Sequence, residues 1–294
     1  MPAAFPRILV VYKKSAYQLH MVERRDRHLR RLLRARHPDV VDLLEAHRVH
    51  QRTLEAVIRA VQDLKLRIDV IYRELVKSTA GYDLVICVGG DGTVLQTSHV
   101  VRDIPVLGVN SDPRRSEAVF CAANASNFLR LVRLAVGGRL PISSLYRLQV
   151  RRNDRPIGPL VLNDVLITHE DPATMSRYRL RIGTRHETHK SSGLWVATAA
   201  GSSSAILAAG GQRLAWEARR FQYRPRELYR GRLSRGRLTG GVLRPRQRAD
   251  LMWLMREGSL FIDGPRVVYP LQFGDRVTVS LSLKHPLRLL GLRQ

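Results

Sequence analysis

The sequence predicts an α/β N-terminal domain with a doubly wound parallel sheet, followed by a β-rich, mainly antiparallel C-terminal domain. In the first half, short and continuously apolar runs alternate with segments whose apolar residues recur at helical spacing, which is typical of a parallel sheet covered by helices. After about residue 141 the pattern changes to strands of alternating polarity separated by turns. We therefore expect domains at 1–140 and 141–282, with the last segment, 283–294, as a candidate to return to the first domain.

The N-terminal elements are predicted in the order strand, two helices, strand, strand, helix, strand. The β-branched run ILVVY (8–12) predicts a buried strand, and residues 18–65 predict two amphipathic helices that break at His37-Pro38. In DLVICVGGDGTVLQTSHVV (83–101), a glycine-rich turn separates a buried strand from a helix. Ligands of such sheets collect at the carboxyl ends of the strands, so a site is expected at this turn. The remaining strands are predicted at 66–72 and 104–110.

The C-terminal half is predicted to consist of short strands. One stretch, 212–250, differs because it holds twelve Arg against three acidic residues and shows little periodicity. We interpret this stretch as a solvated loop with a short helix. The strands are predicted at 145–154, 160–170, 177–183 and 194–200, and within 259–282.

The chain is strongly basic, with 50 Lys and Arg against 25 Asp and Glu, a net charge of +25 over 294 residues. Such a charge favours polyanionic partners, namely nucleic acid, an anionic membrane or a polyphosphate ligand, but it predicts no reaction. Only six of these cations are Lys, and the Arg residues are spread along the chain, so genomic base composition explains the excess equally well. The 44% apolar content excludes a disordered tail.

The two cysteines, Cys87 and Cys121, lie in apolar surroundings and are expected to be small core residues in a reducing compartment. They are too few for a disulfide scaffold, and we expect no metal cluster. The longest apolar stretches are well short of the ~20 residues that cross a bilayer, and the N-terminus lacks the features of a signal peptide. We therefore expect a cytoplasmic protein that does not associate with membranes.

The first chemical motif is Gly89-Gly90-Asp91-Gly92-Thr93, which follows a buried strand and opens a helix. Glycines let the backbone turn sharply and approach a ligand, and the N–H groups at a helix start offer an anion site. A carboxylate repels phosphate, so Asp91 fits best facing a hydroxyl that loses a proton, or orienting a magnesium ion. The alternative, Asp91 as a helix N-cap, leaves the glycines unexplained. The dinucleotide GxGxxG spacing and the Walker lysine are both absent.

The second motif is the adjacent pair Asn163-Asp164, which interrupts the apolar run LVLNDVLITHE. Both side chains are costly to bury without partners. They are therefore expected inside a strand, with partners that are either structural or part of a bound ligand.

The third motif is the segment KSSGLWVATAAGSSSAILAAGG, residues 190–211. A strand runs into a turn rich in Gly and hydroxyl groups, and then into a small-residue helix that another backbone can approach closely. Such a surface can accept a flat ring and hydrogen-bond to its edge, although a Ser-rich turn with no ligand explains the residues as well.

In their order and spacing, these three motifs resemble the NAD kinase family, which transfers a phosphoryl group from ATP or polyphosphate to the 2′-hydroxyl of the adenosine ribose of NAD. The resemblance covers most of the chain, including the late segment REGSLFIDGPRVVYPLQFGDRVTV, residues 256–279. GGDGT alone is shared with lipid kinases and, in a near form, with phosphofructokinases. The resemblance implies an enzyme that makes NADP or NADPH.

The resemblance also assigns roles to individual residues. Asp91 corresponds to the acceptor of the ribose 2′-hydroxyl proton. The remaining positions correspond to residues that bind the dinucleotide, namely Gly90, Gly92, Thr93, Asn163, Asp164, Lys190, Ser192, Ala200, Ser203, Ser204, Ala205 and Ala208.

Two positions depart from the usual pattern of the family. Its usual forms are a GDG triplet before the strand and TPTGSTAY after it, whereas this chain has SSG and TAAGSSSA. Ser192 therefore replaces a carboxylate, and Ala205 replaces an aromatic ring. These departures, with VVYKKSAY near the start and FQYRPRELY at 221–229, are similar to the branch with plant NADH kinase and animal mitochondrial NAD kinase. The lost charge bears on the choice between NAD⁺ and NADH, which stays open here.

For the donor, the resemblance implies ATP or polyphosphate with Mg²⁺ bridging its phosphates and no dedicated metal site in the protein. We hypothesise that Arg residues of 212–250 help to hold this donor. By analogy with the family we expect a homo-oligomer, a dimer or a tetramer. Two alternatives are a lipid kinase of the GGDGT type and a basic nucleic-acid-binding protein. The 18 aromatic residues form no recognisable RNA-stacking motif, so no specific nucleic acid partner is expected.

Overall fold

A computed structural model describes residues 5–231 and 236–292 of the chain. The chain folds into two compact units that divide between Ser143 and Ser144, and from Arg288 it returns to the first unit. Among the described residues, no helix is both long and apolar enough to cross a membrane.

The first unit is built on a parallel sheet with the strand order β2-β1-β3-β4. β3 (Leu84–Gly89) and β4 (Pro105–Asn110) are buried along their whole length, as expected of central parallel strands covered on both faces. The other strands are β1 (Arg7–Tyr12), β2 (Arg67–Tyr72), the short β5 (Ala123–Asn124), and the end of β17 (Arg276–Leu290), which pairs with β4.

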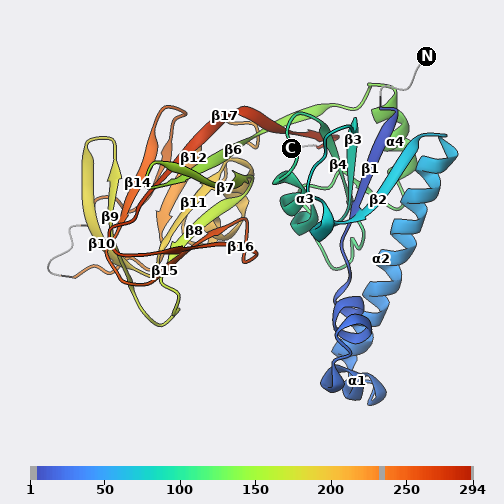
Figure 1. Cartoon of the computed structure of the whole chain (residues 1–294), viewed down its shortest axis with the longest axis horizontal. Coiled ribbons are helices and arrows are strands. Elements are labelled where there is room, and N and C mark those ends of the chain that lie inside the picture. The colour runs from blue at the N-terminus through green and yellow to red at the C-terminus, as the bar shows by residue number, and fades with distance from the viewer. Residues whose placement is uncertain (1–4, 232–235, 293–294) are drawn as a thin grey trace. The chain divides into compact units, whose positions relative to one another are not determined.

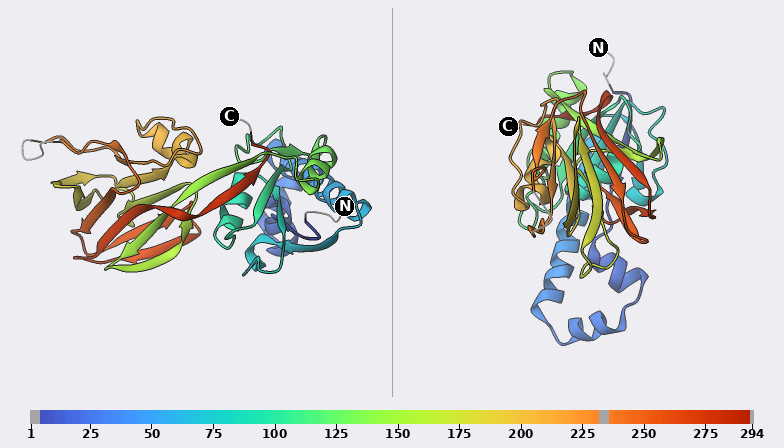
Figure 2. Two further views of the ribbon diagram at one scale, coloured as in Figure 1. Left: turned by 90° about the horizontal axis from the view of Figure 1, so that it is seen from above. Right: turned by 90° about the vertical axis from the view of Figure 1, so that its left-hand side faces the viewer.

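Helices cover both faces of this sheet (Figure 1 and Figure 2). α2 (Pro38–Asp63) and α4 (Phe128–Val136) pack on one face, where Leu54, Val57 and Val61 of α2 join a cluster with the strands. α3 (Asp91–Ser98) lies on the other face. Pro38 begins α2, because its ring restricts φ to helical values and it lacks an N–H that would stay unbonded there. The short helices are a π-helix, η1 (Gln18–Glu23), α1 (Arg27–Arg34), and a 3₁₀ turn, η2 (Arg73–Leu75).

The strand register brings the carboxyl ends of the central strands together. Tyr12 lies opposite Val88, and Gly89 lies opposite Asn110, so the segments that follow β1, β3 and β4 start side by side. The glycine turn therefore lies at the carboxyl edge of the sheet, where open α/β sheets bind ligands.

The second unit contains two antiparallel sheets. One has the order β13-β12-β11-β8-β15-β16, and the other contains β10-β9-β14-β17 with β6 and β7. Two short helices, η3 (Ala200–Ser203) and α5 (Ala205–Ala208), follow β11. The strands are β6 (Ile142–Arg152), β7 (Arg155–Val161), β8 (Asp164–Thr168), β9 (Ser176–Ile182), β10 (Arg185–Ser191), β11 (Leu194–Thr198), β12 (Phe221–Pro225), β13 (Gly241–Leu243), β14 (Arg248–Trp253), β15 (Gly258–Ile262) and β16 (Val267–Leu271).

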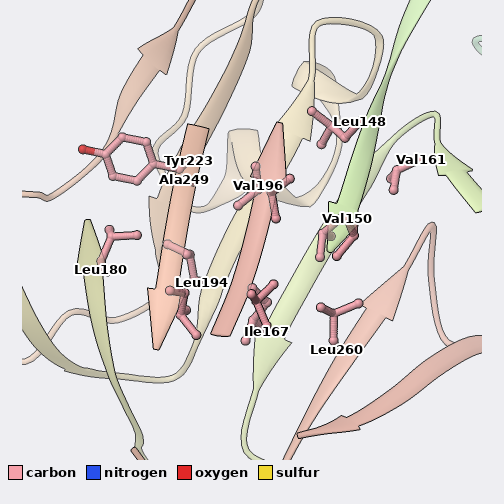
Figure 3. Packing of buried hydrophobic residues seen from close by; sticks show 14 of the residues in the cluster. Leu148, Val150, Val161, Ile167, Leu180, Leu194, Val196, Tyr223, Ala249 and Leu260 are labelled. Atoms are coloured by element: carbon pink, nitrogen blue, oxygen red, sulfur yellow. The ribbon is translucent and has the colours of Figure 1, made fainter. Parts of the chain in front are cut away.

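The core of the second unit is formed by the facing side chains of these sheets. Val196 and Ile167 from one sheet and Leu180 and Leu148 from the other belong to a single buried cluster (Figure 3). The large side chain of Trp253 is fully buried in the same cluster, and its indole N–H donates to the carbonyl of Glu257 at 3.1 Å. The predicted fold class, an α/β unit followed by a mainly antiparallel unit, is confirmed.

Two local expectations from the sequence are wrong, and one strand was missed. The Arg-rich stretch contains β12 and β13 and the start of β14, and its described residues contain no helix. β10 was not predicted, because its sequence RHETHKS is polar. Asn163-Asp164 does not lie inside one strand: β7 ends at Val161 and β8 begins at Asp164.

Candidate functional site

The glycine turn connects β3 to α3 without a side-chain cap. Gly90 is the N-cap residue of α3, and Asp91 is its first residue. A Cβ on Gly89 would lie 2.2 Å from Oγ1 of Thr93, so this position excludes any side chain. Gly92 is exposed, and the nearest atom to a Cβ placed there is Nη1 of Arg73, at 3.9 Å. The turn therefore presents bare backbone at the edge of the sheet.

The Asp91 carboxylate bonds to another segment and does not cap its own helix. Its two oxygens accept hydrogen bonds from the backbone N–H groups of Val119 (2.9 Å) and Phe120 (2.7 Å). Burial raises the pKa of Asp91, the two N–H bonds oppose this rise, and the nearby Glu117 adds to it. Asp91 therefore both lines the turn and positions the segment around Phe120.

The segment from Ser111 to Cys121 is fixed at several further points. A Cβ on Gly108 would lie 2.3 Å from the carbonyl oxygen of Phe120, so the segment crosses β4 at a glycine. Arg115 pairs with Asp112 at 3.0 Å and also bonds to Asp42 of α2. These contacts hold the two N–H groups that bond to Asp91 in place.

Two cations near the turn, Lys13 and Arg73, were not predicted as site residues. Lys13 directly follows β1, and its backbone N–H donates to the carbonyl of Val88 at 3.3 Å. Burial lowers the pKa of Lys13, repulsion from Arg73 lowers it further, and attraction to Asp112 opposes both. Sequence reasoning could have found both residues, because each is the first residue after a predicted strand of the parallel sheet.

In the second unit, Asn163 lies in the break between β7 and β8, and Asp164 is the first residue of β8. The Asp263 carboxylate accepts from the backbone N–H groups of Leu162, Asn163 and Asp164, at 2.9, 2.7 and 3.1 Å. A Cβ on Gly201 would lie 2.1 Å from the carbonyl oxygen of Asn163. The close backbone approach that the small-residue segment predicts is therefore made by Asn163. Sequence reasoning missed Asp263, whose only signal is the turn sequence IDG.

The Asp164 carboxylate is buried against two polar side chains. One of its oxygens accepts from the Ser204 hydroxyl at 2.8 Å and from the Asn163 amide at 3.1 Å. Burial raises the pKa of Asp164 to about 6; the Ser204 bond lowers it in part, and the charge of Asp263 raises it. Asn163, Asp164 and Ser204 thus form one polar group.

The other predicted residues of the second unit fall into two sets. Ala200 and Ser203 lie in η3, and Ala205 and Ala208 lie in α5 with their side chains exposed, so this set adjoins the polar group. Lys190 and Ser192 precede β11. Asp164 lies opposite Ala197, which is near the end of β11. Five strand residues span about 17 Å, so the two sets lie at opposite ends of β11.

Lys190 lies at a separate cavity in the second unit. Its ammonium lies 5.1 Å from the centre of the Tyr229 ring. The cavity has a volume of about 650 Å³ and is lined by cationic residues, Arg177, Lys190 and Arg256, and by apolar ones that include Met175 and Phe273.

No cluster of three or more His, Cys, Asp or Glu side chains that could hold a metal ion occurs in the described part of the chain. Cys87 is buried and Cys121 half-buried, and both are free thiols. Burial raises the pKa of Cys87 to about 12. Neither thiol is therefore placed for nucleophilic chemistry at neutral pH.

The "Probable NADH kinase" of Oryza sativa subsp. japonica is 35% identical to the chain over 272 residues, which are 84% of each protein. The chain belongs to the NAD kinase family. The "NADH kinase" of Arabidopsis thaliana is 30% identical, over 83% of the chain and 85% of that protein. The model of the ATP-NAD kinase N-terminal domain matches residues 8–132, which include the glycine turn.

A solved structure also resembles the NAD kinase fold of this chain. The crystal structure of an NAD kinase from Archaeoglobus fulgidus in complex with ATP aligns with a TM-score of 0.67 at 20% identity, covering 98% of this chain and 94% of the other. At this identity the likeness concerns the fold. The predicted family, with its plant NADH kinase branch, and the predicted class of enzyme, a kinase of NAD or NADH, are confirmed by the relatives. This assignment replaces the lipid-kinase alternative.

Proposed function

We propose that the chain transfers the terminal phosphoryl group of ATP or polyphosphate to the 2′-hydroxyl of the adenosine ribose of NAD⁺ or NADH. In this step a bond forms between the ribose oxygen and the terminal phosphorus, and the bond from that phosphorus to the bridging oxygen breaks. The hydroxyl proton passes to the Asp91 carboxylate. The observation that carries the proposal is the family membership together with Asp91 at a glycine turn on the carboxyl edge of the sheet.

The proposed reaction does not require Asp91 to be a strong base. Phosphoryl transfer has a loose transition state, so the protein mainly positions the reactants and stabilises charge. The two N–H groups that Asp91 accepts from favour its anion, and they hold the carboxylate in one orientation. An oriented carboxylate can direct the hydroxyl and take its proton late in the reaction.

The motif residues are proposed to bind the dinucleotide. Gly90, Gly92 and Thr93 offer close backbone approach at the turn. The polar group of Asn163, Asp164 and Ser204 is proposed to hold the adenosine. Its neighbours Ala200, Ser203, Ala205 and Ala208 leave room for a flat ring. Lys190 and Ser192, at the other end of β11, are proposed to serve the nicotinamide half.

Mg²⁺ is proposed to arrive with the donor. Oδ1 of Asp112 is buried and has no hydrogen-bond partner within the described ranges, and Mg²⁺ commonly takes one or two carboxylates beside phosphate oxygens. Asp112 would therefore help to hold an ion carried by the phosphates, and that ion would supply positive charge that neutralises the donor. We further propose a cytoplasmic homo-oligomer, a dimer or a tetramer, as in the family.

The test is phosphorylation of NAD⁺ and NADH by ATP and by polyphosphate, each with Mg²⁺, comparing the wild type with Asp91→Asn. The variant is expected to lose about 10²-fold or more in kcat, the range of general-base catalysis. A matched control is Asp39→Asn, whose carboxylate is 92% exposed. Because the new amide can accept only one of the two N–H bonds, the melting temperature and NAD affinity are measured alongside. Near-normal kcat in a folded Asp91→Asn protein rejects the role of Asp91, and no product from the wild type rejects the function.

A further inference from the structure

Two cations that the motifs do not include reach the glycine turn from neighbouring strands. Lys13 follows β1 and Arg73 follows β2, and these strands are paired with Tyr12 opposite Tyr72. Cδ of Lys13 lies 3.4 Å from the position of a Cβ on Gly89, and Nη1 of Arg73 lies 3.9 Å from that of a Cβ on Gly92. Both side chains therefore lie directly beside the glycine turn.

Lys13 forms no ion pair within the described residues, although Asp112 is near enough to raise its pKa. In the ranges that the structure describes, no carboxylate oxygen lies within 4.0 Å of its ammonium, and its side chain is half-buried. The next residue is the opposite case: Lys14 pairs with Glu23 at 2.8 Å and lies 4.5 Å from the centre of the Tyr72 ring. A partly buried charge that no ion pair neutralises is costly, and a ligand of opposite charge would offset that cost.

The backbone of Lys13 is fixed, although its ammonium has no ionic partner. The His50 imidazole of α2 donates to the Lys13 carbonyl (Nε2 to O, 2.7 Å), and the Lys13 N–H bonds to β3. Burial lowers the pKa of His50 to about 4, so this imidazole is neutral at pH 7 and adds no charge. The side chain of Lys13 therefore extends from a rigid point toward the turn.

We propose that Lys13, together with Arg73, binds the terminal phosphates of the phosphoryl donor at the glycine turn. This proposal rests on the proposed function and names which cations hold its donor. A lysine ammonium is a compact charge that suits terminal phosphate oxygens, and a guanidinium can bond to two oxygens at once. A role of the Arg residues of 212–250 in holding the same donor is a separate proposal.

The test compares Lys13→Met with Lys14→Met, because both variants remove one charge from adjacent lysines. Isothermal titration calorimetry measures the affinity of each for inorganic tripolyphosphate, for ATP with Mg²⁺, and for NAD⁺. Lys13→Met is expected to raise the Kd for tripolyphosphate and ATP at least tenfold and to leave that for NAD⁺ within twofold. Lys14→Met leaves all three within twofold. Arg73→Met weakens the same two ligands, and Lys13→Arg restores tripolyphosphate binding in part.

Two results would overturn the proposal. Unchanged tripolyphosphate affinity in Lys13→Met shows that this lysine does not hold the donor. A selective loss of NAD⁺ affinity assigns Lys13 to the pyrophosphate of the dinucleotide instead. If Lys13→Met does not fold, Lys13→Gln and the Lys13→Arg rescue supply the same comparison. Tripolyphosphate binding needs no turnover, so the proposal can fail while NAD is still phosphorylated, and it can hold if NAD is not the substrate.

Discussion

Replacing Asp164 with Asn tests whether the buried Asp164 carboxylate lowers the free energy of unfolding at neutral pH. Burial raises the pKa of Asp164 from 3.8 to about 6, which corresponds to about 3 kcal/mol at 1.36 kcal/mol per pKa unit. Between these pH values the folded chain binds more protons than the unfolded one, so this group's contribution to stability is lost as the pH rises from about 4 to above 6. Asp164→Asn does not titrate, and it keeps an oxygen for the Ser204 hydroxyl. Its unfolding free energy relative to wild type is expected to rise by up to about 3 kcal/mol across that window.

The assay is urea unfolding at about pH 4 and about pH 7.5, followed by tryptophan fluorescence. All three tryptophans, Trp195, Trp216 and Trp253, belong to the second unit, so the signal reports on that unit. Asp171→Asn is the control, because backbone N–H bonding from Ala173 lowers the pKa of Asp171 below its ordinary value of 3.8. Asp171 therefore stays ionised across the assayed range, and the stability difference between Asp171→Asn and wild type should be nearly the same at both pH values. An equal difference between Asp164→Asn and wild type at both pH values refutes the reasoning.

The same variant is expected to bind the dinucleotide less well. An ionised carboxylate accepts hydrogen bonds more strongly than an amide, and hydrogen bonds to charged groups contribute roughly 1.5–3 kcal/mol. We expect the Kd for NAD to rise about tenfold or more, measured by calorimetry at pH 7.5. A variant that gains stability at neutral pH and keeps full NAD affinity would show that Asp164 is not a ligand.

Three further changes test contacts that position the site. Gly201→Ala places a Cβ 2.1 Å from the Asn163 carbonyl oxygen, so the melting temperature should fall by several degrees, while Ser203→Ala should leave it nearly unchanged. Asp263→Ala removes the acceptor of three N–H groups and should lower the unfolding free energy by at least about 1.5–3 kcal/mol in urea; a loss below about 0.5 kcal/mol would contradict this. Arg115→Gln breaks the pairs with Asp42 and Asp112, and amide hydrogen exchange near Phe120 should accelerate roughly fivefold, since partly exposed pairs are worth under about 1 kcal/mol.

The sequence was sufficient to predict the sheet of the first unit. LVICVG and PVLGV are apolar without interruption, and such runs are stable only when both faces of a strand are covered. The helix break at His37-Pro38 was predicted for a local reason as well, because proline restricts the residue before it and itself begins α2. These features depend on short-range chemistry, which a single sequence carries.

Other parts could not be predicted, because they depend on contacts between distant segments. β10 is polar, yet it forms a strand because it pairs with β9 along its whole length, with Ser191 opposite Ser176. The break at Asn163 depends on the Asp263 carboxylate, 100 residues away, which bonds to the N–H groups that the break leaves unpaired. The role of Asp91 as an anchor for Phe120 also depends on a segment that joins it only in the folded chain.

The carboxylates of Asp91 and Asp164 differ in what they bond to, and this difference separates their proposed tasks better than their pKa values do. Burial raises the pKa of both Asp91 and Asp164, so a raised pKa does not select the proton acceptor. Asp91 bonds to rigid backbone N–H groups, one on each oxygen, so its orientation is fixed before any ligand binds. Asp164 bonds to a hydroxyl and to the Asn163 side chain, which can exchange for ligand hydroxyls. Because phosphoryl transfer depends on orientation more than on base strength, the fixed carboxylate suits the reaction and the exchangeable one suits binding.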